Sequence, residues 1–434
     1  MSVEETAASP AGAATSSSYK HYVLAILTLV YVVNYLDRQI LSILLPLIKK
    51  EFVLPDVALG LLSGTAFAIV YATLGVPLAI FADRMNRRNI VAISLITFSL
   101  MTVFCGMAAR FWHLLLARFG TGIGEAGTLP SINSILTDYY PPERRATALS
   151  FYSAGLNIGL LLGFFGGGWI AQTYGWRDAF LAAGAPGLLL VFVVLFTVRE
   201  PIRGSAERIA DSGKTPPFWS VVRHLMSLHS FRWMSVGTGL SGFGGYAVIA
   251  FLPLFLTISH HMKPAEIGIV LALLIGIPGA FGTFMSGVLA DRFGKRDKRA
   301  LMFVPLIGSL IAIPFAPIIY LVPNTAIALA GAIVPALMGA IYVGPGLAAV
   351  QSMVPVRMRA QAVALFLFTL NIIGLGLGPL IIGWISDLLG PHLGADSLRW
   401  ALMATMISAY AAVFCYWRST KTLAADIARG ATFA

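Results

Sequence analysis

Charge is scarce in this 434-residue chain. Asp, Glu, Lys and Arg together make up 11% of the residues, whereas hydrophobic residues make up 58%. A soluble globular protein carries about 25% charged residues, so the composition excludes a water-soluble enzyme. Gly and Pro are abundant instead, with 43 and 23 residues, and membrane helices tolerate both because neighbouring segments satisfy the backbone. The sequence therefore predicts a polytopic membrane protein.

Cysteine is scarce as well. Cys105 and Cys415 both lie in apolar runs, far apart in the sequence, and predict neither a disulfide framework nor a thiolate metal site. No Asn-x-Ser/Thr sequon is present, which favours a bacterial inner membrane over the secretory pathway. Since no set of metal ligands or of nucleophile and base is evident, we expect no cofactor, no metal and no enzymatic activity.

Twelve apolar stretches are long enough to cross a bilayer, which takes about 20 helical residues. Between the sixth and the seventh lies segment 199–232, which is rich in Gly, Pro, Ser and charge and is predicted to be a cytoplasmic linker. The sequence thus predicts an all-α protein of two six-helix bundles, 21–198 and 233–417, with a disordered tail at 1–20 and a second tail at 418–434. The stretches are 21–48, 58–82, 90–109, 112–139, 146–173, 178–198, 233–258, 266–290, 301–321, 325–354, 360–386 and 397–417.

The two halves repeat three short motifs in the same order. FADRMNRR, after the second stretch, matches LADRFGKR, which follows the eighth stretch 208 residues later. PPERRA and PVRMRA, before the fifth and eleventh stretches, are 214 residues apart, and Gly-Trp-Ile recurs after 215 residues. Ordered matches of this kind indicate a duplicated six-helix unit, so the two bundles are predicted to be pseudo-symmetric.

The basic residues predict the orientation, because Lys and Arg are retained on the cytoplasmic side of a membrane. With both termini inside, 22 of the 30 Lys and Arg lie on the cytoplasmic side, six lie outside and two lie within the membrane. The cytoplasmic side also holds 11 acidic residues, so it carries the whole net charge of +11. The basic excess is therefore topological, and we expect no nucleic-acid partner.

A motif in two copies suggests a family. A small residue stands four positions before an Asp-Arg pair in each copy, Ala79 before Asp83 and Gly287 before Asp291, which places both on one helix face. With the duplicated halves, these loops resemble the major facilitator superfamily, although Ala79 and Asn86 stand where that family has Gly. The resemblance implies a conformational latch on the cytoplasmic face. Its expected residues are Asp83, Arg84, Arg87, Arg145, Asp291 and Arg292.

Longer runs suggest one branch of that superfamily. These are NYLDR (34–38), RFGTGIGEAGTLPSINSILTDYYPPERR (118–145) and GWRDAF (175–180) followed by APG (185–187). Together they resemble the Spinster branch, whose members are linked to the export of lysophospholipids and sphingolipids. The resemblance implies an amphiphilic lipid substrate, either a lysophospholipid or a long-chain base that can carry a phosphate.

Four ionisable residues lie well inside the predicted hydrocarbon region: Asp37, Arg38, Arg118 and Glu125. A charge there costs about 2.5–3.5 kcal/mol on insertion scales and marks a functional site by default. Arg118 and Glu125 share one helix face about 10 Å apart, whereas the adjacent Asp37 and Arg38 point about 100° apart. We expect Asp37 to pair with Arg118, and Arg38 to pair with Glu125 or a substrate headgroup. The alternative is a static ion-pair network that locks the first helix to the fourth.

Glu125 lies in a glycine-rich run, Gly122 to Gly127, that lets a partner helix approach. The proton affinity of a buried carboxyl changes when an arginine partner comes and goes. We therefore predict that Asp37 and Glu125 carry a proton, while Arg38 and Arg118 bind an anionic headgroup.

The second half has almost no charge in its predicted spans. Its stretches 233–259, 267–290, 300–356 and 361–386 contain no Asp, Glu, Lys or Arg. A cavity between the halves would be charged on one wall and apolar on the other, which suits an amphiphile better than a sugar. The expected substrate-binding residues are Arg38, Arg118, Asn34, Tyr35, Tyr152, Asn157, Phe243, Tyr246 and Asn371.

The sequence as a whole predicts a proton-coupled secondary active transporter that moves an amphiphilic lipid by alternating access. We expect a monomer in a bacterial inner membrane, with protons and a lipid-like small molecule as its partners. Two alternatives remain open. One is a transporter of small organic anions or drugs, and the other is an uncoupled lipid scramblase or a membrane receptor.

Overall fold

The computed structural model describes residues 17–71, 73–74, 85–202, 217–355 and 358–431. Every regular element in these ranges is helical, which confirms the predicted all-helical class. α1 begins at Ser17, so residues 17–20 do not belong to a disordered tail as predicted. The reason is local packing, since the Tyr19 hydroxyl donates to the carbonyl of Thr197 and accepts from the backbone N–H of Arg199.

The helices follow one another with short connections. The first half contains α1 (Ser17–Phe52), α2 (Asp56–Gly60), η1 (Leu61–Thr65), α4 (Arg87–Gly106), α5 (Phe111–Ala126), α6 (Thr128–Tyr139), α7 (Pro142–Thr173) and α8 (Trp176–Thr197). A short helix, α9 (Phe218–Ser227), lies in the predicted linker.

The second half begins with α10 and ends with the long α19. Its elements are α10 (His229–His260), α11 (Pro264–Gly294), α12 (Ala300–Ala312), η2 (Ile313–Phe315), α13 (Ala316–Leu321), α14 (Thr325–Met338), α15 (Val343–Ser352), α16 (Arg359–Leu370), η4 (Asn371–Leu377), α17 (Gly378–Leu393), η5 (Gly394–Asp396), α18 (Ser397–Met403) and α19 (Thr405–Ala431).

Nine helices of the described chain are long and apolar enough to cross a membrane, and the last of these, Arg359–Arg429, covers two of the predicted spans. Two other predicted spans are not among the nine. Predicted span 58–82 is described in part, as the apolar helix Asp56–Tyr71, while residues 72 and 75–82 lie outside the described residues. Predicted span 112–139 is divided at Gly127 into α5 and α6. The interruption at Gly127 therefore leaves two helices there that are each shorter than a membrane span.

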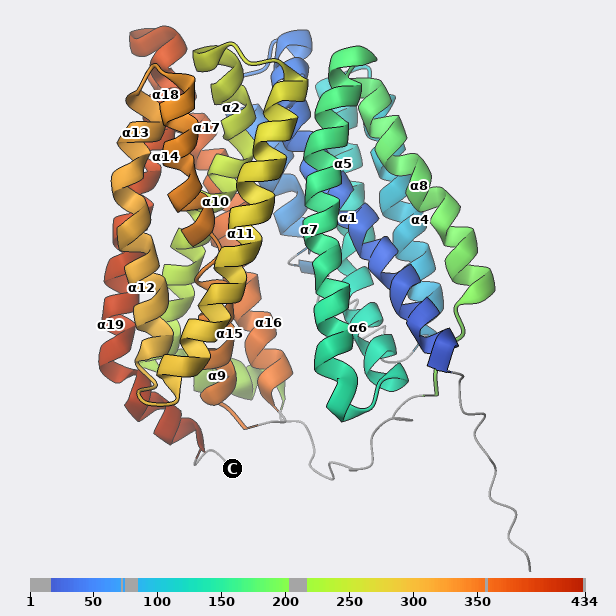
Figure 1. Ribbon diagram of the computed structural model, residues 1–434, viewed down its shortest axis with the longest axis vertical. Helices are drawn as coiled ribbons and strands as arrows, with labels where there is room; N and C mark the ends of the chain where they lie inside the picture. The colour runs from blue at the N-terminus through green and yellow to red at the C-terminus, as the bar shows by residue number, and fades with distance from the viewer. Residues whose placement is uncertain (1–16, 72, 75–84, 203–216, 356–357, 432–434) are drawn as a thin grey trace, which may run out of the picture.

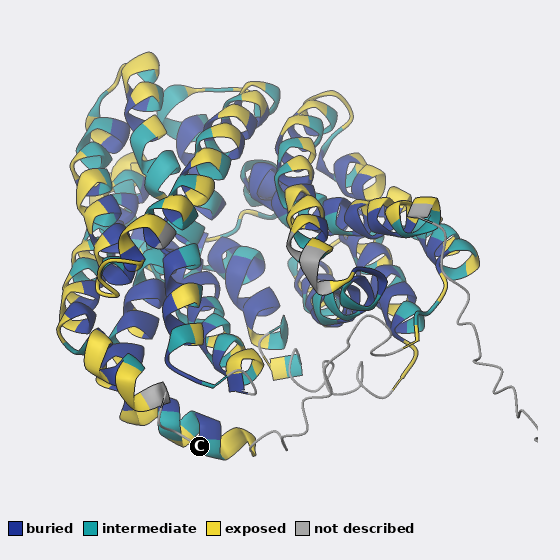
Figure 2. Cartoon of the chain, turned by 60° about the horizontal axis from the view of Figure 1, so that its bottom comes forward, coloured by how far each residue is buried: buried dark blue, intermediate teal, exposed yellow. Residues whose placement is uncertain are grey.

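The helices form two bundles that stand side by side. α4 to α8 lie in one bundle and α12 to α19 in the other, and α1 begins at the end of the molecule where α19 ends (Figure 1). We call the opposite end, with Asp56, Gly168 and Asp387, the distal end. The outer faces of both bundles carry many exposed residues (Figure 2). Large apolar side chains such as Phe196 and Ile407, 81% and 73% exposed, fit a surface that faces lipid.

Close helix packing depends on glycine where α5 crosses α4. A Cβ atom at Gly124 would lie 2.9 Å from both the Cβ of Phe98 and the carbonyl oxygen of Ser94. The glycine-rich run in front of Glu125 therefore lets α4 approach, as small residues do in membrane helix interfaces.

Replacing Gly124 with leucine is expected to destabilise the first bundle by about 1–3 kcal/mol or more, because overpacking forces side chains and backbone apart. The thermal unfolding midpoint of the purified protein in detergent measures the effect. Gly166→Leu is the matched control, since a Cβ there meets no heavy atom within 4 Å. Equal midpoints for the two variants would contradict the packing role of Gly124.

Candidate functional site

The four intramembrane charges come from two neighbouring helices. α1 carries Asp37 and Arg38, and α5 carries Arg118 and Glu125. Asp37, Arg118 and Glu125 are 3%, 1% and 7% exposed. Buried ions need partners because desolvation is costly, and the structure provides two separate pairs.

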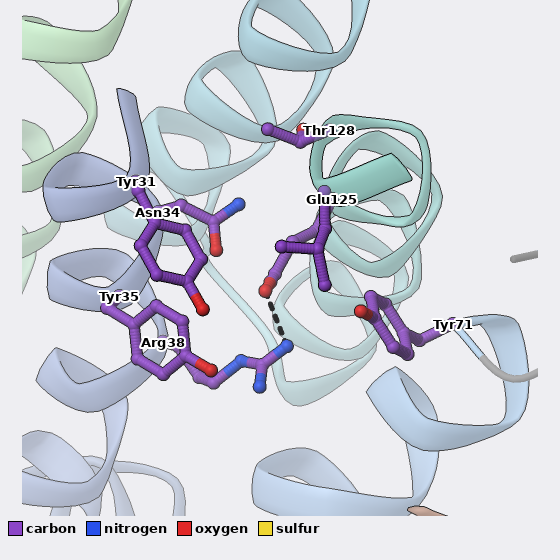
Figure 3. Close-up of a pocket in the computed structure, with 8 residues that line it drawn as sticks. Tyr31, Asn34, Tyr35, Arg38, Tyr71, Glu125 and Thr128 are labelled. Atoms are coloured by element: carbon purple, nitrogen blue, oxygen red, sulfur yellow. Dashed lines mark hydrogen bonds and ion pairs between the residues drawn. The ribbon is translucent and has the colours of Figure 1, made fainter. Parts of the chain in front are cut away.

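Arg38 is paired with Glu125 through Nη2 and Oε1, as the sequence predicts (Figure 3). Its guanidinium carbon also lies 4.4 Å from the ring centre of Phe67, 5.2 Å from that of Tyr35 and 5.6 Å from that of Tyr71. Cation–π contacts of this kind stabilise a desolvated guanidinium. The cation is thus held between one carboxylate and three aromatic rings.

Asp37 turns to the other side of α1 and meets two residues of its own bundle. The Thr102 hydroxyl on α4 donates to its Oδ1 at 2.6 Å, and Nη1 of Arg118 lies 3.8 Å from its Oδ2. The predicted pairing of Asp37 with Arg118 is therefore confirmed as an ion pair. Thr102 was not predicted, because one hydroxyl in an apolar stretch has no distinguishing signal in the sequence.

A small cavity of about 20 Å³ lies beside the Arg38–Glu125 pair. Its wall combines polar groups with the rings of three tyrosines, and it includes the predicted Asn34 and Tyr35. The lining residues are Tyr31, Asn34, Tyr35, Arg38, Tyr71, Glu125, Thr128 and Leu129 (Figure 3).

The other predicted substrate residues do not line this cavity. Tyr152 stacks on Tyr31 with ring centres 4.4 Å apart and is almost fully buried. From the second half, Tyr246 packs on the cluster of Phe67, Ala68 and Leu375. These contacts place Tyr152 behind the cavity wall and Tyr246 at the junction of the halves.

The three remaining predicted residues lie on α7, α10 and η4. Asn157 on α7 and Phe243 on α10 are half-buried. The amide of Asn371 donates to the carbonyl of Leu367 on its own helix at 2.9 Å. The roles of all three in binding stay predictions.

The predicted latch is described only in part. Asp83, Arg84 and the side chain of Asp291 lie outside the described residues, and Arg292 is exposed. The structure does describe Arg87 and Arg145.

Arg87 is 2% exposed and pairs with Asp138 at 2.5 Å and with Glu200 at 2.7 Å. Arg145 donates to the carbonyls of Thr137 and Tyr140. All these contacts lie within the first bundle or at its end, so these two arginines brace that bundle. Their part in a latch stays a prediction.

Hydrogen bonds join the two halves at the distal end. The carboxylate of Asp387 on α17 accepts from the backbone N–H groups of Asp56 and Val57, at 2.8 and 2.7 Å, where α2 begins. Ser386 donates to Oδ2 of Asp56 at 2.7 Å, and Nζ of Lys49 lies 2.5 Å from its Oδ1. Since a helix N-terminus favours a negative charge, Asp387 clamps the second half onto the first.

Glycines and helix irregularities let the halves meet closely at the same end. A Cβ at Gly168 on α7 would collide with the backbone of Pro264 on α11, and one at Gly383 with the backbone of Asp56. Farther down, the π-helical turns η1 and η4 face each other, and the Thr65 hydroxyl donates to the carbonyl of Gly376 at 2.6 Å. π-helical turns occur frequently at functional sites.

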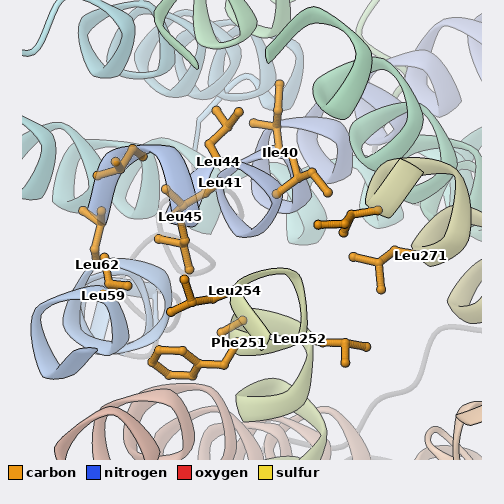
Figure 4. Close-up of a cluster of buried hydrophobic side chains, with 14 of the residues drawn as sticks. Ile40, Leu41, Leu44, Leu45, Leu59, Leu62, Phe251, Leu252, Leu254 and Leu271 are labelled. Atoms are coloured by element: carbon orange, nitrogen blue, oxygen red, sulfur yellow. The ribbon is translucent and has the colours of Figure 1, made fainter. Parts of the chain in front are cut away.

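Apolar side chains complete the distal contact. A single buried cluster includes Leu44 and Leu45 of α1, Leu59 of α2 and Leu254 of α10, and so crosses from one half to the other (Figure 4). Two further clusters lie each within one half. The largest shared core thus belongs to the distal part of the molecule, and the small cluster of Phe67, Ala68 and Leu375 joins the halves beside Arg38.

Comparison with known proteins agrees with this architecture. The sequence profile of the Major Facilitator Superfamily matches residues 27–332 and 234–432. An MFS-type efflux pump of Mycolicibacterium smegmatis is 32% identical over 408 residues, which cover 93% of each chain. Protein spinster homolog 1 of Xenopus tropicalis is 28% identical over 400 residues, 86% of this chain and 74% of that protein.

A solved structure extends the likeness to three dimensions. It is a bacterial homolog of the human lysosomal transporter Spinster, crystallised in an inward-facing and unoccupied conformation, and it superimposes with a TM-score of 0.86. Sequence identity is 33%, over 95% of this chain and 99% of that one. The resemblance seen in the sequence is therefore confirmed. The chain belongs to the Major Facilitator Superfamily and is a Spinster-like membrane transporter rather than an enzyme.

Proposed function

We propose that this transporter moves an amphiphilic lipid, a lysophospholipid or a long-chain base such as sphingosine phosphate, and couples its movement to protons. The observation that carries the proposal is the Arg38–Glu125 pair, which lies beside a cavity walled by aromatic rings. The chain would cross a bacterial inner membrane twelve times as a monomer, with both termini in the cytoplasm.

The pair supports coupling because each partner can take a different ligand. Protonation of Glu125 removes the charge that holds Arg38, and the freed guanidinium can then bind an anionic headgroup by charge-assisted hydrogen bonds. Removing one partner of a buried pair costs about 3–5 kcal/mol when nothing replaces it. A proton on Glu125 and a headgroup on Arg38 therefore favour each other's binding, which is the requirement for coupled transport.

The distribution of charge supports an amphiphile. The cation and the carboxylate both come from the first half, whereas α10, η4 and α17 contribute no charged side chain between residues 233 and 259 or between 361 and 386. Within the first half, Arg38 faces the rings of Phe67 and Tyr71. Tyr246 of the second half packs on the cluster that contains Phe67. A headgroup would meet Arg38, and an acyl chain would lie along apolar surface.

The distal contacts support alternating access. If both termini are cytoplasmic, the distal end faces outward, and its closure by Asp387 makes this conformation inward-facing. The solved Spinster homolog that superimposes on the chain is itself inward-facing. Outward opening would require the Asp387 clamp and the Gly168 contact to separate.

A second candidate function is efflux of a drug or a small organic anion. The relative in Mycolicibacterium smegmatis is named as an efflux pump and matches nearly the full chain. The same arginine and aromatic rings could hold a flat organic anion. An uncoupled scramblase or a receptor would not need a carboxylate, such as Glu125, whose charge a proton can neutralise.

The coupling is tested with Glu125→Gln. In proteoliposomes with an imposed pH gradient, wild-type protein is expected to take up one or more members of a panel of lysolipids and long-chain bases faster than without the gradient. Glutamine cannot gain or lose a proton, so the variant is expected to show the same rate with and without the gradient. Asp396→Asn, at an exposed acidic residue of the distal end, should keep the gradient dependence.

Two results would refute parts of this proposal. Wild-type transport of a hydrophilic anion or a drug, with no lipid moved, would exclude the lipid substrate. A Glu125→Gln variant that still responds to the gradient would exclude Glu125 as the coupling residue.

The clamp is tested with Asp387→Asn. A hydrogen bond to a charged group contributes about 1.5–3 kcal/mol, and 1.4 kcal/mol is a tenfold change in an equilibrium. The variant is expected to populate the outward-open state about tenfold more. Spin labels at the exposed Thr173 and Lys263, one on each half at the distal end, should report a longer distance by paramagnetic resonance. Asp396→Asn, at the same end, should leave the distance unchanged, and an unchanged distance in Asp387→Asn would exclude the clamp.

A further inference from the structure

Thr128 stands out because its hydroxyl is buried beside the Arg38–Glu125 pair without a partner. It is the first residue of α6, is 2% exposed and lines the same small cavity as Glu125 and Asn34. Within the part of the chain that the structure describes, its Oγ1 makes no hydrogen bond. Because no protein group occupies this hydroxyl and it lines the cavity beside Glu125, it is available to accept a hydrogen bond from a group that turns into the cavity.

Protonated Glu125, in turn, requires a hydrogen-bond acceptor. In this conformation its Oε1 accepts from Arg38. Once the carboxyl is protonated and Arg38 has left, it becomes a hydrogen-bond donor. A carboxylic O–H buried without an acceptor is unfavourable, so the proton-loaded state needs an oxygen close by.

We propose that Thr128 accepts the hydrogen bond of protonated Glu125 in the state in which Arg38 is released. The inference deepens the proposed proton coupling and rests on it. Glu125 lies three residues before Thr128, and Gly127 between them keeps a right-handed helical backbone conformation, so the two side chains are neighbours. The cavity of about 20 Å³ that both residues line gives the carboxyl room to turn away from Arg38. Thr128 is thus a positioning residue that acts through Glu125.

The sign of the effect follows from the present conformation. Thr128 has no bond with Glu125 while the carboxylate is paired with Arg38. A bond formed only after protonation favours the protonated form, so Thr128 would let Glu125 hold its proton up to a higher pH. Removing the hydroxyl is expected to move the conformational transition to lower pH.

The charged and titratable surroundings of Glu125 would not change with this substitution. All the charged and titratable groups around Glu125 lie on helices other than α6, so replacing Thr128 with valine leaves every charge in place. They are Asp37, Arg38, Tyr31 and Tyr35 on α1, Arg118 on α5, Tyr71 on the helix Asp56–Tyr71, Tyr152 on α7 and Tyr246 on α10.

The experiment compares Thr128→Val, which keeps the shape, with Thr128→Ser, which keeps the hydroxyl. The readout is the distance between spin labels at Thr173 and Lys263 as a function of pH, with no substrate added. The wild type is expected to change distance around one midpoint pH. Loss of one hydrogen bond is expected to lower that midpoint by about one pH unit in Thr128→Val, whereas Thr128→Ser should match the wild type.

Ser131→Ala is the matched control. Ser131 is also fully buried on α6 with an unpartnered hydroxyl, but it does not line the cavity, so its removal should leave the midpoint unchanged. An unchanged midpoint in Thr128→Val, or an equal shift in Ser131→Ala, would overturn the role of Thr128 alone. A wild type without any pH response, or a Glu125→Gln variant that keeps it, would overturn the proposed coupling itself.

Discussion

The buried ion pair between Arg38 and Glu125 is the constraint on which the rest of the site depends. A guanidinium and a carboxylate inside a membrane protein stabilise each other only while both are charged and in contact. The surrounding rings of Tyr35, Phe67 and Tyr71 offer the cation further attraction but no second full charge. Separation of the pair therefore needs a proton on the acid, and an anion on the base lowers its cost further. The pair therefore responds to two ligands, a proton on Glu125 and an anion on Arg38.

The adjacency of Asp37 and Arg38 divides the four charges into two groups. Neighbouring residues on a helix point about 100° apart, and the structure uses this angle to send Asp37 into the first bundle and Arg38 toward the second. Asp37 lies within one bundle, among α1, α4 and α5, where Thr102 and Arg118 hold it. Arg38 lies where helices of both halves meet. The Arg38–Glu125 pair is therefore the one that lies at the junction between the two halves.

Much of this could be predicted from the sequence, and the remainder could not for identifiable reasons. The helical class and the two ion pairs follow from apolar length and from four charges in an otherwise apolar region. The Asp387 clamp did not follow, because it joins residues about 330 positions apart and depends on which end of the molecule is closed. The break at Gly127 was hidden for a different reason. Glycine in a membrane stretch signals close packing as readily as a helix end. Here Gly124 and Gly127 both pack closely against α4, and the helix is also interrupted at Gly127.

Closure of the distal end has to be strong enough to seal and weak enough to reverse. A two-state transporter needs states that differ by only a few kcal/mol, and the distal contact combines a few polar bonds, close glycine backbones and a shared apolar cluster. Gly168 and Gly383 bring helix backbones into direct contact, and the apolar cluster that includes Leu44, Leu59 and Leu254 crosses the same contact. Asp387 adds a directional bond to a helix start that water can satisfy once the halves part. Asp387 thus adds a polar contribution to an apolar contact that already favours this conformation, while protonation of Glu125 supplies an opposing change at the junction.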